Sequence, residues 1–175
     1  MYDLSIEGHM SELELLHIEK WASEVPENGV IMEVGSLYGR SAYAWAKSCH
    51  PSVNVYCVDT FYDIGTGRDF YPEFCENTKD IPNITSISTV CPYFSYSRYV
   101  DKQADVFFVD ARHINPNDWE IIKFGLANLK PGGLLCGHDY HENFPDVIEN
   151  VDRLEHLLGK KASLHSSTLL WSFVV

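Results

Sequence analysis

A glycine-bracketed segment, Glu33-Val-Gly35-Ser-Leu-Tyr-Gly39, joins a short apolar run to a stretch rich in alanine and aromatic residues. Its glycines let the backbone approach a ligand closely, and a helix that follows offers unpaired N–H groups. The dinucleotide fingerprint needs Gly-x-Gly-x-x-Gly, whereas three residues separate these two glycines. The sequence also lacks a Gly-x-x-x-x-Gly-Lys phosphate loop. With an acid at position 33, the spacing favours a cationic ligand without phosphates.

A second acid, Asp59, ends the next apolar run and lies 24 residues after Gly35. A carboxylate at the end of that strand can accept hydrogen bonds from both ribose hydroxyls of a nucleoside. A cationic, phosphate-free nucleoside with a free ribose describes S-adenosylmethionine. The loop and Asp59 together therefore predict this cofactor, although the glycines alone are equally typical of a tight turn that binds nothing.

Ionisable residues also follow two later apolar runs. Asp110 ends one of them, and His113 lies three residues beyond it. An imidazole titrates near neutrality and can accept the proton of a substrate hydroxyl, but His113 could equally orient its loop or bind substrate. The densest group of ligand-type side chains comes later and comprises His138, Asp139, His141 and Glu142. This group indicates either a metal site or an anchor for the loop.

Alternating strands and helices position these residues. Apolar runs predict strands at 30–34, 53–58, 84–90, 104–109 and 134–137, with one or two more within 163–175. Helices are predicted from the capping box Ser11–Glu14 to about residue 25, and at 41–49, 69–79, 116–129 and 145–158. Residues 60–68 are expected to form a loop, and Lys130-Pro-Gly-Gly133 to interrupt the chain. This order predicts an α/β fold with a doubly wound, mostly parallel seven-stranded sheet and helices on both faces.

Bulk properties set further limits. The 175 residues fit one domain, with a helical segment at 1–28 and an α/β core at 29–175. A formal net charge of −12 argues against nucleic acid as a partner. No apolar run is long enough to span a membrane, and the first residues lack the pattern of a signal peptide. Five widely spaced cysteines indicate reduced thiols, so a cytoplasmic location is expected. Aromatic stretches around residues 62–71 and 93–99 are interpreted as core or as the wall of an acceptor pocket.

These motifs, in this order, resemble class I S-adenosylmethionine-dependent methyltransferases. The similarity is greatest to the short group that includes macrocin and sugar O-methyltransferases. It spans nearly the whole chain and rests on the segments 7–11, 32–41, 58–61, 109–113, 129–140, 144–147 and 168–171.

The resemblance implies a role for individual residues. The methionine end of the cofactor would contact Glu33, Gly35, Ser36, Tyr38 and Gly39, with Ser41 reaching the same loop. Asp59 would bind the ribose, and Thr60 and Phe61 would lie beside the adenine. Asp110 would contact the cofactor or a metal, and His113 and Asp139 are the candidate catalytic residues.

Metal-dependent relatives hold a divalent ion such as magnesium with one acid after the fourth strand and an acidic pair after the fifth. The corresponding residues here are Asp110 and the pair His138-Asp139. Because magnesium prefers oxygen ligands, His138 departs from the pattern of a hard-cation site.

The expected function is therefore O-methylation of a small-molecule hydroxyl, such as that of a sugar or a glycosylated metabolite. The chain lacks the helical cap of larger relatives, so its pocket is either open or completed by a second copy in a homodimer. Two alternatives stay open at this point: a non-catalytic protein that binds S-adenosylmethionine, and an NAD-type oxidoreductase.

Overall fold

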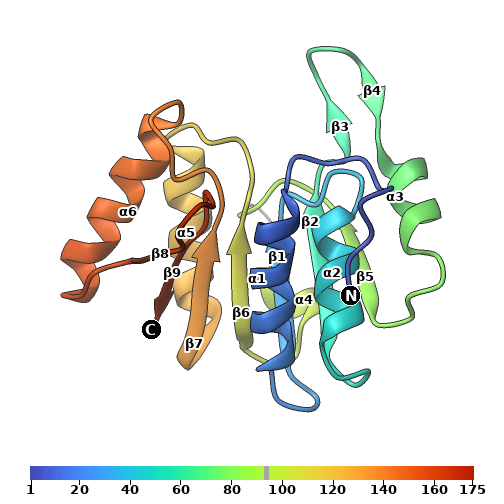
Figure 1. The fold of residues 1–175 in the computed structure, drawn as a ribbon, viewed down its shortest axis with the longest axis horizontal. Coiled ribbons are helices and arrows are strands. Elements are labelled where there is room, and N and C mark those ends of the chain that lie inside the picture. Colours follow the sequence, from blue (N-terminus) through green and yellow to red (C-terminus); the bar gives the residue numbers. More distant parts are fainter. Residues whose placement is uncertain (93–94) are drawn as a thin grey trace.

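A computed structural model describes residues 1–92 and 95–175, so the aromatic residues Tyr93 and Phe94 lie outside the described residues. Within that part of the chain seven strands form the main sheet, in the order β5-β2-β1-β6-β7-β9-β8 (Figure 1). From one edge to the other these strands are Ile84–Ser88, Asn54–Asp59, Val30–Val34, Ala104–Val109, Leu129–Gly137, Trp171–Val174 and Ser163–Leu164. The first five are parallel, and β9 is antiparallel to both of its neighbours.

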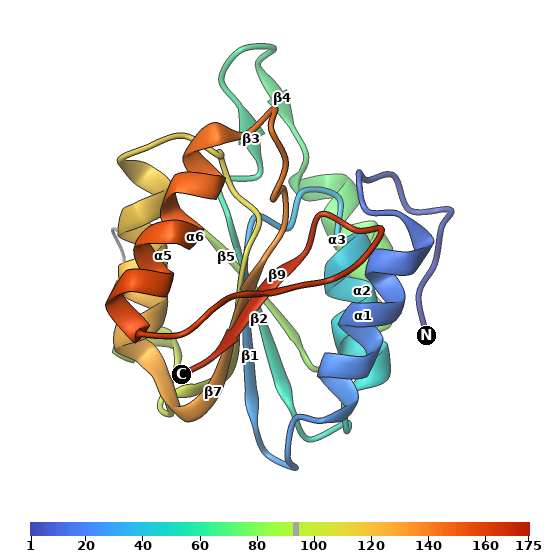
Figure 2. The same cartoon turned by 60° about the vertical axis from the view of Figure 1, so that its left-hand side comes forward.

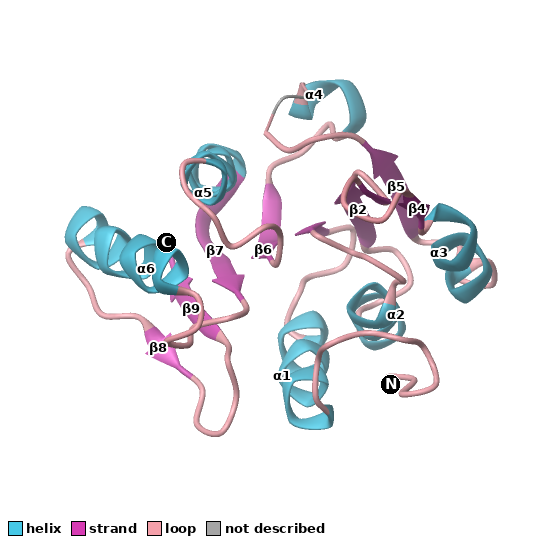
Figure 3. Cartoon of the chain, turned by 90° about the horizontal axis from the view of Figure 1, so that it is seen from above, coloured by secondary structure: helices cyan, strands magenta, loops and turns pink. Residues whose placement is uncertain are grey.

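Helices cover both faces of the sheet (Figure 3). One face carries α1 (Glu12–Ser23), α2 (Arg40–Ser48) and α3 (Tyr71–Thr78), which share one hydrophobic core with the strands. The other face carries α4 (Tyr96–Tyr99), α5 (Asn117–Asn128) and α6 (Pro145–Leu158), which pack in a second core. The predicted doubly wound α/β fold is confirmed.

Burial on both faces explains why the strands are continuous apolar runs in the sequence. All five residues of β1 are buried, and successive side chains enter opposite cores. Ile31 packs with the α1 and α2 layer, whereas Met32 packs with α5 and α6. β1 pairs with β2 on one side and β6 on the other, so it lies at the centre of the parallel sheet.

The structure differs from the sequence-based expectation in three places. Residues 60–68 belong to a projecting hairpin of β3 (Tyr62–Asp63) and β4 (Arg68–Asp69), visible at the top of Figure 2. Lys130-Pro-Gly-Gly133 interrupts no strand; it forms a register shift within β7. The short helix α4 was not expected.

The side chain of Arg40, at the start of α2, holds the segment that precedes α1. The Arg40 guanidinium donates hydrogen bonds to the carbonyl oxygens of Ile6 and Met10 at 2.6 and 2.9 Å. The predicted capping box between Ser11 and Glu14 is present, and it starts α1 directly after this segment. Residues 7–10 are thereby held at the carboxyl end of the sheet.

Two sequence-based expectations concern the environment of the chain. All five cysteines are free thiols, as expected, and Cys57 and Cys136 are fully buried. Across the described residues, no helix combines the length and the apolar character needed to cross a membrane.

The strand order reverses between β1 and β6, because β1 connects to β2 on one side and β6 connects to β7 on the other. Gly35 follows β1 with a φ of +95°, and a Cβ there would lie 1.7 Å from the carbonyl oxygen of Asp110. Only glycine tolerates this close approach of two backbones. The position therefore ties the loop after β1 to the loop after β6.

We predict that Gly35→Ala lowers the free energy of unfolding by about 3 kcal/mol or more, because backbone strain and a steric clash act together. Gly132→Ala is the matched control, since Gly132 also has a positive φ of +80° but no atom within 4 Å of the added Cβ. The control should lose only about 1–2 kcal/mol. Equal losses for both variants in urea unfolding would contradict the proposed clash.

Candidate active site

A cavity of about 750 Å³ lies beyond the carboxyl ends of β1, β2, β6 and β7. This volume is in the range of pockets for drug-sized and nucleoside-sized ligands. Ten of the residues singled out from the sequence line it, namely Gly35, Ser36, Tyr38, Ser41, Asp59, Thr60, Asp110, His113, His138 and Asp139. Their convergence follows from the topology, since parallel strands end at one edge of the sheet.

Three other predicted cofactor residues do not line this cavity. The Phe61 ring is 1% exposed and packs against Phe74, so only its backbone is near the site. Gly39 is the N-cap of α2, and a Cβ there would meet Phe74 at 3.2 Å. Glu33 is completely buried behind the lining residues Ser36 and Ser41. The binding roles of these three residues stay predictions.

Asp59 fastens the loop after β1 to the loop after β2. Its Oδ2 accepts hydrogen bonds from the backbone N–H groups of Ser36 and Leu37 at 2.8 and 2.9 Å. Its Oδ1 accepts one from the N–H of Phe61 at 2.8 Å. Each carboxylate oxygen has about two acceptor positions, so Oδ2 is filled, and the second position of Oδ1 is approached by the Thr60 hydroxyl at 3.5 Å. The acid that the sequence assigns to ribose therefore also shapes the loop around it.

Glu33 is an acid without a partner. Neither of its carboxyl oxygens, nor Ser36 Oγ, makes a hydrogen bond among the described residues. Burial raises the pKa of Glu33 to about 7; the nearby hydroxyls of Ser36 and Ser41 oppose this shift, although neither reaches hydrogen-bond geometry. A buried carboxyl group that lacks a partner gains stability when a cation binds nearby.

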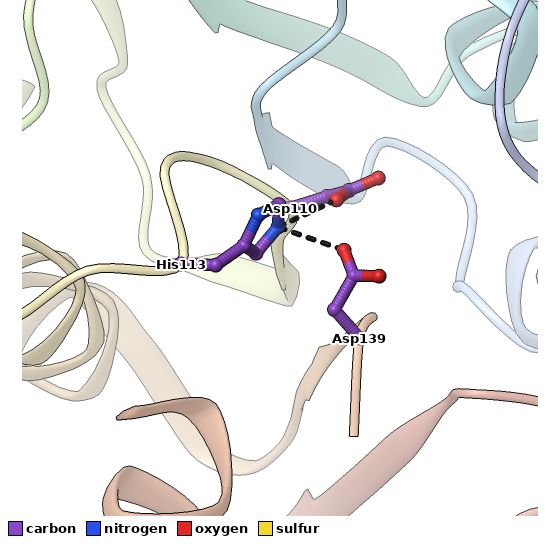
Figure 4. A group of neighbouring side chains, drawn as sticks. All are labelled: Asp110, His113 and Asp139. Carbon is purple, nitrogen blue, oxygen red and sulfur yellow. Dashed lines mark hydrogen bonds and ion pairs between the residues drawn. The ribbon is translucent and has the colours of Figure 1, made fainter. Parts of the chain in front are cut away.

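His113 lies between two carboxylates (Figure 4). Its Nε2 is 3.2 Å from Oδ1 of Asp110 and 2.8 Å from Oδ2 of Asp139. Asp110 follows β6 and Asp139 follows β7, which are adjacent in the sheet. The backbones of His113 and Asp139 adopt positive φ values of 59° and 60°. Such conformations are strained for residues other than glycine and gather at functional sites.

His138 extends this group into the protein. Its Nδ1 is 3.1 Å from Oδ2 of Asp139, and its Nε2 is 3.0 Å from Oε1 of Glu14 on α1. The second contact is an ion pair without the geometry of a hydrogen bond. Glu14 also accepts the backbone N–H of Leu169 at 2.9 Å. Both His138 and Glu14 are 4% exposed, so the pair is shielded from water.

The close packing of these groups changes their pKa values. Burial disfavours charge on both histidines, but the surrounding carboxylates dominate and raise the pKa of His113 and of His138 to about 10. Burial would raise the pKa of Glu14, yet His138 and the Leu169 N–H lower it to about 2. Asp139, although largely buried, has a pKa well below its ordinary range because both imidazoles contact it. At neutral pH the group is a network of charges of opposite sign.

Comparison with known proteins places this geometry in a family. Residues 32–140 match the family model described as a methyltransferase domain. The chain belongs to this methyltransferase family. The match contains the loop after β1, Asp59, Asp110, His113 and Asp139. Methyltransferases of this class use S-adenosylmethionine as the methyl donor. No curated protein matches the sequence of this methyltransferase.

Solved structures share the fold of this methyltransferase at low sequence identity. The TDP-rhamnose 3′-O-methyltransferase of calicheamicin biosynthesis aligns with a TM-score of 0.69 and 14% identity, over 93% of this chain and 77% of that one. An rRNA methylase from Streptococcus thermophilus aligns with a TM-score of 0.62 and 15% identity, over 95% and 98%. An S-adenosylmethionine-dependent O-methyltransferase from Thermotoga maritima gives 0.62 and 17%, over 86% and 52%. The fold is thus common to proteins named for different acceptors.

The donor atoms of this methyltransferase do not suit magnesium. Asp110, His113 and Asp139 offer ligand atoms within 4.8 Å of one another, but one of these atoms is a nitrogen. Magnesium requires near-octahedral coordination and prefers oxygen. The nitrogen of His113 contacts both carboxylates (Figure 4), so it would be a ligand of any ion bound between them. His138, the histidine of the sequence-based metal prediction, contacts Asp139 through one nitrogen and Glu14 through the other.

Sequence reasoning did not identify Glu14 as part of the site. The capping box correctly indicated its role at the start of α1, but nothing local indicated its contact with His138. It also missed Glu7, Gly8, His9 and Met10, which line the cavity. The sequence signal for these residues is the segment 7–11 of the family resemblance, and in the structure hydrogen bonds from Arg40 hold this segment in place.

We predict that the Glu14–His138 pair stabilises the methyltransferase most between about pH 4.5 and 6.5. Because the pKa of His138 is raised, the stabilisation from its charge is fully present below pH 6.5 and is lost as the pH rises towards 10. Because the pKa of Glu14 is lowered, the stabilisation from its charge is fully present above pH 4.5 and is lost as the pH falls towards 2. The difference in the free energy of unfolding between the wild type and His138→Gln, measured in urea at an acid, an intermediate and an alkaline pH, should be greatest at the intermediate pH.

The matched control is His50→Gln, because His50 is exposed and lies 3.7 Å from the exposed Glu27. Its effect should stay within about 0.5 kcal/mol at every pH. A difference between wild type and His138→Gln that does not change with pH would contradict the ionic interpretation of the pair.

Proposed function

We propose that this protein transfers the methyl group of S-adenosylmethionine to a hydroxyl oxygen of a small molecule, such as a sugar or a glycosylated metabolite. The observation that carries the proposal is the position of His113. Its Nε2 lies at the cavity between Asp110 and Asp139, on the same edge of the sheet as the glycine loop and Asp59. The proposed base, the loop proposed to bind the nucleoside and the space for the acceptor therefore lie at one edge of the sheet.

The loop after β1 favours a nucleoside without phosphates. In a dinucleotide-binding protein the backbone N–H groups at this position receive pyrophosphate. Here the N–H groups of Ser36 and Leu37 donate to Asp59, so a phosphate would meet an occupied site and a negative charge. The buried, unpartnered Glu33 beside the same loop favours a cation. Both features support S-adenosylmethionine over NAD.

We predict that calorimetry detects binding of S-adenosylmethionine and of its demethylated product, and none of NAD. Asp59→Ala should weaken cofactor binding at least about tenfold, because ribose hydroxyls lose a charged acceptor and the loop loses its fastening. Glu27→Ala is the control, since this exposed acid lies in the turn before β1, at the opposite end of the sheet. Unchanged affinity in Asp59→Ala would refute the ribose assignment, and tight NAD binding would favour an oxidoreductase.

For methyl transfer the protein must align the acceptor oxygen with the methyl group and remove one proton from the acceptor. When bound, the cofactor supplies an electrophilic methyl group on a sulfonium, with a neutral thioether as the leaving group. Asp110 and Asp139 hold the His113 ring so that Nε2 faces the cavity. Once Nε2 has released its own proton to solvent, the proton of the acceptor passes to Nε2 as the acceptor oxygen forms its bond to carbon, and the methyl ether is the product.

His113 must lose its own proton before it can act as a base. In the protein without ligands the two carboxylates raise its pKa to about 10. A bound cation beside the same carboxylates lowers the pKa of His113, because like charges disfavour each other. Cofactor binding and activation of the base are therefore coupled in this proposal.

We predict that His113→Gln lowers the rate of methyl transfer about 10²-fold or more, while cofactor affinity is unchanged or higher, because the variant removes a charge that competes with the sulfonium. In the wild type, kcat/KM should rise with pH through an apparent pKa above 6.5, since the raised pKa keeps His113 protonated at lower pH. This rise should be absent in His113→Gln and retained in His50→Gln. An unaltered pH profile in His113→Gln would assign the base to another group. Cofactor binding without transfer to any hydroxyl acceptor would favour the non-catalytic alternative.

Charge and cavity size support a small acceptor. The net charge of −12 opposes a nucleic-acid substrate, although the fold is shared with an rRNA methylase. The cavity of about 750 Å³ has room for a nucleoside and a compact acceptor together. A homodimer that completes the acceptor side, and a cytoplasmic location, stay predictions.

A further inference from the structure

We propose that the imidazole of His138, held by Glu14, performs the structural task of a divalent ion at this site, so that methyl transfer runs without a metal. This inference rests on the proposed function and names a property of the same site. It follows from where the ring atoms of His138 lie. Two acids, Asp110 and Asp139, end adjacent strands at the catalytic edge and would repel each other without a positively charged or hydrogen-bond-donating group between them.

In the protein without ligands the two imidazole rings neutralise both acids without an ion, and His138 continues to do so after His113 has released its proton. Nδ1 of His138 is 3.1 Å from Oδ2 of Asp139 and 3.9 Å from Oδ1 of Asp110. Nε2 of His113 contacts the same two oxygens from the cavity side. An ion bound to these carboxylates would have to displace Nδ1 of His138 from Asp139 and take Nε2 of His113 as a ligand. Because nitrogen is a poor ligand for magnesium, neither imidazole ring would bind this ion well.

Glu14 keeps the His138 ring in this position. The backbone of His138 is fixed independently, since its carbonyl oxygen accepts a hydrogen bond from Trp171 Nε1 at 3.1 Å. The ring has Asp139 on one side and Glu14 on the other, and it is 4% exposed. Glu14 is itself fixed by the Leu169 N–H and by the capping box. Glu14 is therefore a positioning residue that acts on the site through His138.

The test replaces His138 with an acid, so that the site resembles one that binds a divalent cation. In Glu14→Gln/His138→Glu, a carboxylate replaces the ring and its former partner loses its charge, which leaves three acids at the edge. Titration calorimetry with MgCl₂, MnCl₂ and ZnCl₂ should show no stoichiometric binding to the wild type. The double variant should bind Mg²⁺ and Mn²⁺ at least about tenfold more tightly than the wild type, because hard cations prefer carboxylate oxygens. His138→Gln, which adds no acid, is the matched control and should bind neither ion.

Each outcome decides the proposal. Stoichiometric binding of any of the three ions to the wild type, abolished by Asp110→Asn, would overturn it. A folded double variant that binds no ion would also overturn it, because His138 would then not lie at a ligand position. If the double variant fails to fold, the wild-type titration decides, together with cofactor-dependent methyl transfer in EDTA, which should be unchanged. Loss of that activity in EDTA, restored by Mg²⁺, would contradict the proposal.

Failure of the proposed function is measured separately, by calorimetry with S-adenosylmethionine. A protein that binds neither the cofactor nor a metal ion fails the function without bearing on how its acids are satisfied. A protein that binds the cofactor and requires Mg²⁺ keeps the function and fails this inference.

Discussion

The approach of Gly35 to the carbonyl oxygen of Asp110 is the constraint on which the site depends. The strand order reverses between β1 and β6, so the loops after these strands diverge and open a cavity between them. Without a Cβ at position 35 the two backbones can meet at the base of that cavity. The contact fixes the loop after β1 against the backbone of Asp110. The loop proposed to bind the nucleoside and the acid–histidine network are thereby connected through one backbone contact.

Glu14 links the helical layer to the same edge. Its Oε2 closes the capping box of α1, and its Oε1 contacts His138 and the N–H of Leu169. A capping acid at a helix start is ordinarily exposed, and its burial here is tolerated because each oxygen has partners. The start of α1, the loop after β7 and the loop before β9 consequently share one charged group. Displacing any of them would leave a buried charge unpaired, at a cost of several kcal/mol.

Local pattern was enough to predict the layers and the edge of the sheet at which the cavity lies. Continuous apolar runs such as 30–34 and 104–109 are what strands buried on both faces require, and parallel strands bring Asp59, Asp110 and Asp139 to one edge. Contacts between distant segments could not be predicted in this way. The pairing of Glu14 with His138 has no sequence spacing that signals it. The packing of the Phe61 ring on Phe74 and its φ of 53° were likewise not predictable from local pattern, and its role beside the adenine stays a prediction.

The electrostatics of the site connect cofactor binding to proton transfer. Asp110 and Asp139 favour a positive charge, and in the protein alone that charge is the proton on His113. In the proposed reaction a sulfonium enters the same field, and two cations then compete for the same carboxylates. By linkage, each weakens the other, so the cofactor promotes release of the proton that blocks the base. Because Glu14 is a second partner for the charge of His138, this proposal expects the protonation of His113 to respond more strongly to the cofactor than that of His138.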